Sequence, residues 1–319
     1  MHAEMSHTPE KILLAAPRGY CAGVDRAVQT VQQALDLYGA PVYVRKEIVH
    51  NKHVVDQLAE RGAIFVDSES EIPHGSNTVF SAHGVSPAVR ENSAARQLSV
   101  IDATCPLVTK VHREAVKFAA AGYTIVMIGH AGHEEVEGTM GEAPGQIVLV
   151  QDEQDVENLE IDDPSKVAYI SQTTLSVDET TAIIERLRER FPEITGPRTG
   201  DICYATTNRQ AAVKQLAEVA DLVLVIGSRN SSNSNRLVEV VREMGTPAYL
   251  IDNAAQMREQ WLEGVSVLGI SSGASAPEEL VSELVELFKA RGVDDIQELE
   301  VMPEDTRFML PKAIREALA

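Results

Sequence analysis

The sequence predicts an α/β fold of three similar lobes with mostly parallel sheets. Two observations lead to this fold class. Short β-branched runs alternate with helical patterns along the chain, and three cysteines recur at nearly equal intervals, each where a helical pattern begins. The chain has 319 residues, which is enough for two or three compact domains. Because the lobes share little sequence identity, one large sheet with accidental cysteine spacing is the alternative.

Short apolar runs mark the expected strands. In chain order they are Lys11–Ala16, Val42–Val44, Ala63–Val66, Thr78–Phe80, Ser99–Ile101, Tyr123–Ile128, Ile147–Val150, Val167–Ile170, Leu222–Ile226, Ala248–Ile251 and Val265–Ile270. Strands that alternate with helices pair in parallel, because the crossover helix returns the chain to the end of the sheet at which the previous strand began.

Apolar stripes at helical spacing follow each cysteine. They cover residues 24–38 after Cys21, 108–119 after Cys105 and 210–220 after Cys203. Pro106 suits the first turn of the second stripe, since its missing N–H has no partner there in any case. We therefore expect each cysteine at, or just before, the start of a helix.

The domain boundaries follow these helix starts. We expect a flexible extension over residues 1–10, lobes over residues 22–105, 106–200 and 201–297, and a C-terminal tail over residues 298–319. The tail combines Pro303 and Pro311 with charged residues, so it is interpreted as either a docking arm or a frayed end.

The charge balance excludes several classes of partner. The chain has 28 Lys and Arg against 48 Asp and Glu, a formal net charge of −20. Such a surface repels polyanions, which argues against nucleic acid and anionic lipid but leaves a small phosphorylated ligand open. The uncharged stretch around 118–133 is too short and too polar to span a bilayer, so no membrane association is expected. Residues 1–10 lack a secretory signal pattern, and a cytoplasmic location is the default expectation.

The odd number of cysteines disfavours a disulfide framework. A thiolate at a helix N-terminus is stabilised by unpaired N–H groups, which prepares it as a nucleophile or metal ligand. One such cysteine is as easily an inert core residue, but three of them, one for each lobe, suggest a shared centre. Three thiolates without C-x-x-C pairs fit an iron–sulfur cluster better than a structural zinc site, and would leave one iron open to a ligand.

The histidines provide further candidates. All nine lie at or before His133. His50, His83 and His133 occur among small residues, and His133 is followed by Glu134 and Glu135. Each could be an ordinary loop histidine, and the acidic pair could be a solvated turn. The functional interpretation is a group prepared for proton transfer by its neighbours.

Three hydroxyl-rich segments complete the pattern. Residues 171–179 contain a helix cap at Ser176, residues 227–237 follow a strand with clustered Ser and Asn, and residues 271–280 repeat this arrangement with Ser275 as a donor. Each turn alone could be a cap or linker. Strand-to-helix turns bind anions, however, and together with the histidines they outline a pocket for a small, highly charged anion such as a diphosphate.

Nine sequence blocks resemble the LytB/IspH family of diphosphate reductases. They are PRGYCAGVDRAV, EIVHN, FSAHGVS, DATCPLVTKVH, IGHAGHEEVEGTMG, SQTTLSVD, GDICYATTNRQ, GSRNSSNSNRL and SSGASAPEELV, and they occur in order between Lys11 and Val281. The resemblance implies three α/β lobes around a central [4Fe–4S] cluster, with the strand in residues 11–21 completing the third lobe. It also implies the last step of the methylerythritol phosphate (non-mevalonate) route to isoprenoids. There (E)-4-hydroxy-3-methylbut-2-enyl diphosphate loses its hydroxyl reductively to give isopentenyl and dimethylallyl diphosphate.

The resemblance also implies a role for each matching residue. The cluster ligands would be Cys21, Cys105 and Cys203, leaving one iron open. The diphosphate and substrate contacts would be His50, His83, His133, Thr173, Ser231, Ser232, Asn233 and Ser275. The proton-handling group near the hydroxyl would be Glu135, Thr173 and His133. The residues before Lys11 and after Glu298 match no block.

The family resemblance implies an external electron donor, a ferredoxin or flavodoxin. Such donors are often acidic, so docking on this chain would need a local basic patch, for which Arg18, Arg26, Lys46 and Lys110 are candidates. Two other functions fit the residues alone: an iron–sulfur hydro-lyase without net electron transfer, or a cluster-based sensor that binds an anion without turnover.

Overall fold

The computed structural model describes residues 7–319, which form two compact units. The smaller unit contains the described residues up to Cys21, together with His50–Val54 and Tyr204–Thr306. The larger unit contains Ala22–Val49, Val55–Cys203 and Arg307–Ala319. Residues 1–6 of the predicted extension lie outside the described part of the chain.

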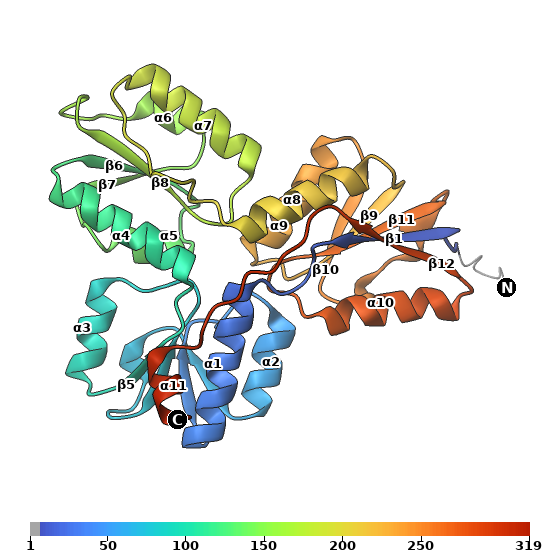
Figure 1. Ribbon diagram of the computed structural model, residues 1–319, viewed down its shortest axis with the longest axis horizontal. Coiled ribbons are helices and arrows are strands. Elements are labelled where there is room, and N and C mark those ends of the chain that lie inside the picture. The colour runs from blue at the N-terminus through green and yellow to red at the C-terminus, as the bar shows by residue number, and fades with distance from the viewer. Residues whose placement is uncertain (1–6) are drawn as a thin grey trace. The chain divides into compact units, whose positions relative to one another are not determined.

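The smaller unit is built on a five-stranded parallel sheet in the order β10-β9-β11-β1-β12. Its strands are β1 (Lys11–Ala16), β9 (Leu222–Ile226), β10 (Ala248–Ile251), β11 (Val267–Ser272) and β12 (Asp295–Glu300). The helices α8 (Tyr204–Ala217) and α9 (Ser232–Glu243) cover one face, and α10 (Glu278–Ala290) covers the other (Figure 1). The central strand β9 is LVLVI and entirely buried, as expected for a strand covered on both faces.

Strand β1 lies inside this sheet, hydrogen-bonded to β11 on one side and β12 on the other. This arrangement joins the start of the described chain to the segment near its end (Figure 1). Strand β12 spans residue 297, where the sequence predicts that the third lobe ends and the C-terminal tail begins. Its sequence DIQELE is acidic and mostly exposed, as suits an edge strand, and it lacks the apolar pattern by which strands are predicted.

The larger unit contains two parallel sheets. The first has the order β3-β2-β4-β5, from β2 (Val42–Arg45), β3 (Ala63–Val66), β4 (Asn77–Phe80) and β5 (Ser99–Asp102). Its helices are α1 (Ala22–Tyr38), α2 (Lys52–Glu60), which begins in the smaller unit, and α3 (Pro87–Ala95). The short C-terminal helix α11 (Lys312–Ala317) contacts α1.

The second sheet of this unit has the order β7-β6-β8, from β6 (Thr124–Ile128), β7 (Ile147–Val150) and β8 (Val167–Ser171). Helices α4 (Pro106–Ala120) and α5 (Glu134–Met140) pack on one face, while α6 (Glu153–Asn158) and α7 (Val177–Arg190) pack on the other. Ser176 caps α7 by accepting a hydrogen bond from the N–H of Glu179, which confirms the predicted cap.

Three mostly parallel sheets with flanking helices confirm the predicted fold class. The cysteines also lie where the helical stripes place them. Cys105 is the N-cap of α4, and Cys21 and Cys203 directly precede α1 and α8. Among the described residues, no helix combines the length and apolar character needed to cross a membrane.

Candidate functional site

The carboxylate of Glu135 is enclosed by the protein. Glu135 lies in the first turn of α5 and is 2% exposed. Thr173, just beyond the end of β8, donates to it twice: its backbone N–H reaches Oε1 at 2.7 Å and its hydroxyl reaches Oε2 at 2.9 Å. A buried carboxylate held by two donors from one residue has a fixed position, and Thr173 Oγ1 is in direct hydrogen-bond contact with it.

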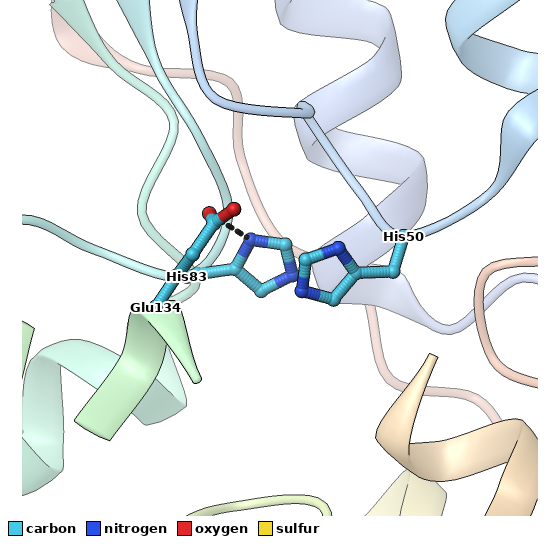
Figure 2. Close-up of side chains that lie close together, drawn as sticks. All are labelled: His50, His83 and Glu134. Atoms are coloured by element: carbon cyan, nitrogen blue, oxygen red, sulfur yellow. Dashed lines mark hydrogen bonds and ion pairs between the residues drawn. The ribbon is translucent and has the colours of Figure 1, made fainter. Parts of the chain in front are cut away.

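His133 is the N-cap of α5, and its Nδ1 accepts a hydrogen bond from the Glu135 N–H at 3.2 Å. Since Nδ1 acts as acceptor, the neutral ring carries its proton on Nε2. The ring of His133 meets that of His83 edge to face, with centroids 5.8 Å apart. His83 Nδ1 lies 3.1 Å from Glu134 Oε2 (Figure 2). The loop after β4 and the start of α5 therefore bring together two histidines and two carboxylates.

A buried histidine that sequence analysis did not select supports this group. His112 on α4 is 7% exposed, and its Nδ1 lies 2.7 Å from Glu142 Oε1. A Cβ atom added to Gly84 would lie 3.0 Å from His112 Nε2, and one added to Gly138 would lie 3.4 Å from the backbone carbon of Gly84. Gly84 follows His83 and Gly138 belongs to α5, so these glycines allow the close packing that sets His83 beside the start of α5.

Two of the three cysteines belong to the larger unit. The Cys105 N–H donates to Ala82 O at 3.0 Å, and the Cys203 N–H donates to Thr173 O at 3.0 Å. The second bond ties Cys203 directly to the residue that holds Glu135. Arg26 lies near Cys105, and its Nη1 donates to the carbonyls of Ala103 and Thr104. Burial lowers the pKa of the Arg26 guanidinium, while the charges of Cys105 and Asp102 act to raise it.

Lys110 connects the segments that carry these two cysteines. From α4 its Nζ donates to Thr199 O at 2.7 Å, Gly200 O at 3.0 Å and Asp201 Oδ1 at 2.9 Å. Asp201 also accepts from the Ser171 N–H at 3.0 Å. Burial, followed by the hydrogen bond and charge of Asp201, raises the pKa of neighbouring Glu114 to about 7. One ammonium group therefore anchors the approach to Cys203 on the helix that begins at Cys105.

The third cysteine lies in the smaller unit. The Cys21 N–H donates to Ala274 O at 3.2 Å. Arg209 of α8 is 1% exposed, and its Nη2 donates to Gly19 O at 2.7 Å while its Nη1 reaches Glu304 Oε2 at 3.0 Å. Gly19 has φ +69°, a backbone conformation that favours glycine. The buried guanidinium thus holds the loop before Cys21, and the segment after β12 provides its counter-ion.

The hydroxyl and amide groups predicted for the smaller unit gather at two neighbouring turns. Ser231 caps α9 by accepting from the Ser234 N–H at 3.3 Å, and Asn233 Oδ1 accepts from the Ala274 N–H at 2.8 Å. Ser275 Oγ donates to His50 O at 2.9 Å. Ser231, Asn233 and Ser275 are 4–6% exposed, and Ser232 is half-buried in the first turn of α9. The turns after β9 and β11 therefore share polar groups with the segment that carries His50.

The cations predicted for partner docking are already engaged. Arg18 pairs with Glu278 at 2.7 Å, Lys46 with Asp67 at 3.1 Å and Lys110 with Asp201 at 2.9 Å. Arg26 donates to three backbone carbonyls and to Met309 O. Their charges are therefore largely committed inside the chain, which weakens the basis for a docking patch made of these four residues.

The three cysteine side chains have the chemistry of soft metal ligands. All three lie in the described part of the chain, none forms a disulfide there, and each is half-buried. Each cysteine precedes a helix, and its backbone N–H donates to a carbonyl, which fixes the backbone. At Cys105, the N-cap of α4, the thiol makes no capping hydrogen bond. Thiolates in such positions are suitable ligands for an iron–sulfur cluster.

Comparison with known proteins decides the family. The model of the family described as LytB protein matches residues 12–289. The chain belongs to the LytB family. It is 57% identical over 311 residues to the 4-hydroxy-3-methylbut-2-enyl diphosphate reductase of Leifsonia xyli subsp. xyli, covering 97% of this chain and 92% of that protein. It is 54% identical to the Streptomyces coelicolor protein of the same name over 319 residues, covering 100% and 94%.

Solved structures agree with this LytB assignment. The E-1-hydroxy-2-methyl-but-2-enyl-4-diphosphate reductase of Plasmodium falciparum has a TM-score of 0.94 and 37% identity, covering 97% of this chain and 98% of that one. A structure described as (E)-4-hydroxy-3-methyl-but-2-enyl diphosphate reductase, the terminal enzyme of the non-mevalonate pathway, has a TM-score of 0.63 and 30% identity, covering 88% and 99%. The LytB family is known for an iron–sulfur cluster, and the chemistry of the three thiols agrees with it.

The LytB blocks contain two supporting residues that the sequence analysis missed. His112 is the last residue of DATCPLVTKVH, and Arg209 lies in GDICYATTNRQ. Their contacts join segments far apart in the chain, so spacing does not reveal their partners. The sequence does hold one sign of a buried partner, which is a charged residue on the apolar face of a helix. Arg209 is such a residue, because it shares a face of α8 with the buried Ala205 and Ala212.

Proposed function

We propose that this chain is a 4-hydroxy-3-methylbut-2-enyl diphosphate reductase. The allylic alcohol takes up two electrons and two protons, its C–O bond breaks, and isopentenyl or dimethylallyl diphosphate leaves with one molecule of water. The observation that supports this most strongly is the buried Glu135 carboxylate held twice by Thr173, in a chain 57% identical to proteins named for this reaction. The reaction needs a proton source shielded from bulk water, and this pair provides one.

We assign the cluster ligands to Cys21, Cys105 and Cys203. A [4Fe–4S] cluster held by them would supply the two electrons one at a time and leave one iron open to the substrate hydroxyl. The chain contributes the fixed loops: Ala82, Thr173 and Ala274 each accept the N–H of one cysteine. These carbonyl contacts hold the backbone that presents each thiol.

Proton transfer is assigned to Glu135, Thr173 and His133. Once Glu135 is protonated, its carboxyl O–H can donate to the Thr173 hydroxyl, which lies 2.9 Å from Oε2, and that hydroxyl passes its own proton to the leaving oxygen. His133 fixes the backbone of Glu135, because its Nδ1 accepts a hydrogen bond from the Glu135 N–H. The groups act as a short relay for the proton that leaves with the hydroxyl as water, and the second proton is added to carbon after the C–O bond breaks.

The diphosphate is assigned to His50, His83, Ser231, Ser232, Asn233 and Ser275. The Glu134 carboxylate, 3.1 Å from His83 Nδ1, holds the ring in a fixed orientation in which an imidazole N–H can be directed at a phosphate oxygen. Ser and Asn groups at the start of α9 add short donors where the helix dipole favours an anion. Binding energy gained at the diphosphate, which does not react, orients the alcohol for reduction.

The test is an assay of the anaerobically purified full chain. We expect iron and sulfide in a ratio that matches one four-iron cluster, and reduction of the allylic diphosphate alcohol by dithionite with a viologen mediator. Glu135→Gln should keep the cluster absorbance and lose nearly all turnover, while Glu137→Gln on the same helix serves as the control. Full activity of Glu135→Gln would remove it from the proton relay. Hydration of the substrate without electron consumption would instead identify a hydro-lyase, and binding without turnover a sensor.

We also propose a ferredoxin or flavodoxin as the electron donor. The engagement of Arg18, Arg26, Lys46 and Lys110 means that docking would depend on contacts other than free charge on these residues. Reduction rates measured with each purified donor at rising salt test this. A rate that is insensitive to salt would support docking without a basic patch, whereas a steep fall would restore the electrostatic interpretation.

A further inference from the structure

We infer a second anion site, in the smaller unit, for small organic phosphates or diphosphates. A cavity of about 740 Å³ lies beside the edge strand β10, and three arginines line it: Arg229, Arg242 and Arg258. No Asp or Glu lines this cavity, although the chain as a whole carries a net charge of −20. The volume is typical of small-molecule pockets.

The three guanidinium groups are uncompensated by carboxylates. All three residues are exposed, and within residues 7–319 none forms an ion pair. Two nearby acids are held by other cations, Glu259 by Arg291 at 2.6 Å and Glu239 by Arg236 at 2.7 Å, while Asp252 accepts from the amide of Gln256 at 2.8 Å. The arginine charges at this cavity are thus available to a ligand.

Two of the arginines are held in place by aromatic rings. Tyr249 and Trp261 stack with centroids 4.0 Å apart and planes 7° from parallel. The guanidinium of Arg242 lies 5.9 Å from the Tyr249 ring centre, and that of Arg258 lies 5.5 Å from the Trp261 ring centre. A guanidinium held over a ring has restricted freedom, so less side-chain entropy is lost when it binds an oxyanion.

Backbone contacts further restrict Arg242. Its Nε and Nη2 donate to Ala248 O at 3.0 and 2.7 Å, at the outer edge of β10. This bond fixes the direction of the side chain and covers a carbonyl of an edge strand. Arg242 is therefore fixed by two contacts, the Tyr249 ring and the Ala248 carbonyl, unlike a solvated surface arginine.

The remaining lining defines the class of ligand. The amides of Asn235 and Gln256 add polar groups, while Leu250 and Met257 contribute half-buried apolar surface. Guanidinium forks match phosphate oxygens with two parallel hydrogen bonds each, and a phosphate ester offers three oxygens and up to two charges. The apolar side favours an organic phosphate over the inorganic ion. This assignment does not rest on the proposed function, because none of its residues has a role there.

The only tryptophan of the chain reports on this cavity. The experiment titrates the anaerobic, cluster-containing protein with inorganic diphosphate and with dimethylallyl diphosphate while following Trp261 fluorescence. We expect a saturable change with both probes, with tighter binding of the organic one. Arg229→Ala should weaken binding about tenfold, which corresponds to the loss of one charge-assisted pair. Arg258→Lys should weaken it also, since it keeps the charge but loses the fork.

Matched variants separate this cavity from the proposed substrate site. Arg61→Ala removes the same charge from an exposed pair with Asp36 and should leave the titration unchanged. Asn233→Ala should impair turnover yet keep the fluorescence response. A response that survives Arg229→Ala and disappears in Asn233→Ala would assign the signal to the substrate site and overturn the proposal. The absence of any saturable change at millimolar probe would overturn it equally.

Discussion

Thr173 holds Glu135 with two hydrogen bonds, from its N–H to Oε1 at 2.7 Å and from its hydroxyl to Oε2 at 2.9 Å. The carbonyl of the same threonine accepts the N–H of Cys203. A single residue therefore connects the buried carboxylate to the backbone of a proposed cluster ligand.

Removing the hydroxyl of Thr173 tests the relay. We expect Thr173→Val to lower turnover about 100-fold, because the backbone bond to Glu135 remains but the proton path is lost. Thr173→Ser should recover most of the activity. The measurement is steady-state turnover together with cluster absorbance, which should be equal in all three proteins. A Val variant with the activity of the Ser variant would contradict the relay.

The close packing of Gly84 is tested against a glycine with the same backbone. Gly84 has φ +81° and would place a Cβ 3.0 Å from His112 Nε2, whereas Gly75 has φ +75° with nothing within 4 Å. We expect Gly84→Ala to cost about 1–3 kcal/mol more than Gly75→Ala, from displacement of His112. Chemical unfolding measures the difference. Equal costs would show that only backbone strain matters.

The raised pKa of Glu114 predicts a pH dependence of stability. Because its folded-state pKa of about 7 lies above the ordinary 4.5, the folded state binds the proton more tightly. The stabilisation is complete below pH 4.5 and is lost as the pH rises through 7. Glu114→Gln should flatten this part of the stability curve. Unfolding curves of the two proteins from pH 5 to 8 give the comparison, and parallel curves would refute the assignment.

Arg209 and Glu304 form a buried pair whose loss should be costly. We expect Glu304→Ala to destabilise the protein by about 3–5 kcal/mol, since it leaves a buried guanidinium without its counter-ion. Removing the exposed Arg61–Asp36 pair by Arg61→Ala should cost below about 1 kcal/mol. Iron content should also fall in Glu304→Ala, because Arg209 holds the loop before Cys21. Unchanged stability and iron content would show that the pair has no structural role.

Strands and helices can be predicted from the sequence where apolar periodicity is strong. β9 and β10 match their predicted bounds, and Cys105 lies at the helix start that Pro106 marks. Strand β12 was not predicted, because its sequence DIQELE is acidic and lies on an exposed edge. The same reasoning explains the site: local context selects Glu135 and Ser275, whereas their partners are set by tertiary contacts. Thr173 is 38 residues from Glu135, and His50 is 225 residues from Ser275.

The position of β1 between β11 and β12 has a consequence for biosynthesis. Strand β1 leaves the ribosome long before its partners, which begin at Val267 and end at Glu300. Until then its KILLAA edges are unpaired, and Cys21 has no Ala274 carbonyl to bind. Pairing of such distant segments is slow. The Cys21 loop therefore cannot take its final conformation until Ala274 has been synthesised. In the nascent chain, the carbonyl partners of Cys105 and Cys203 are available earlier than that of Cys21.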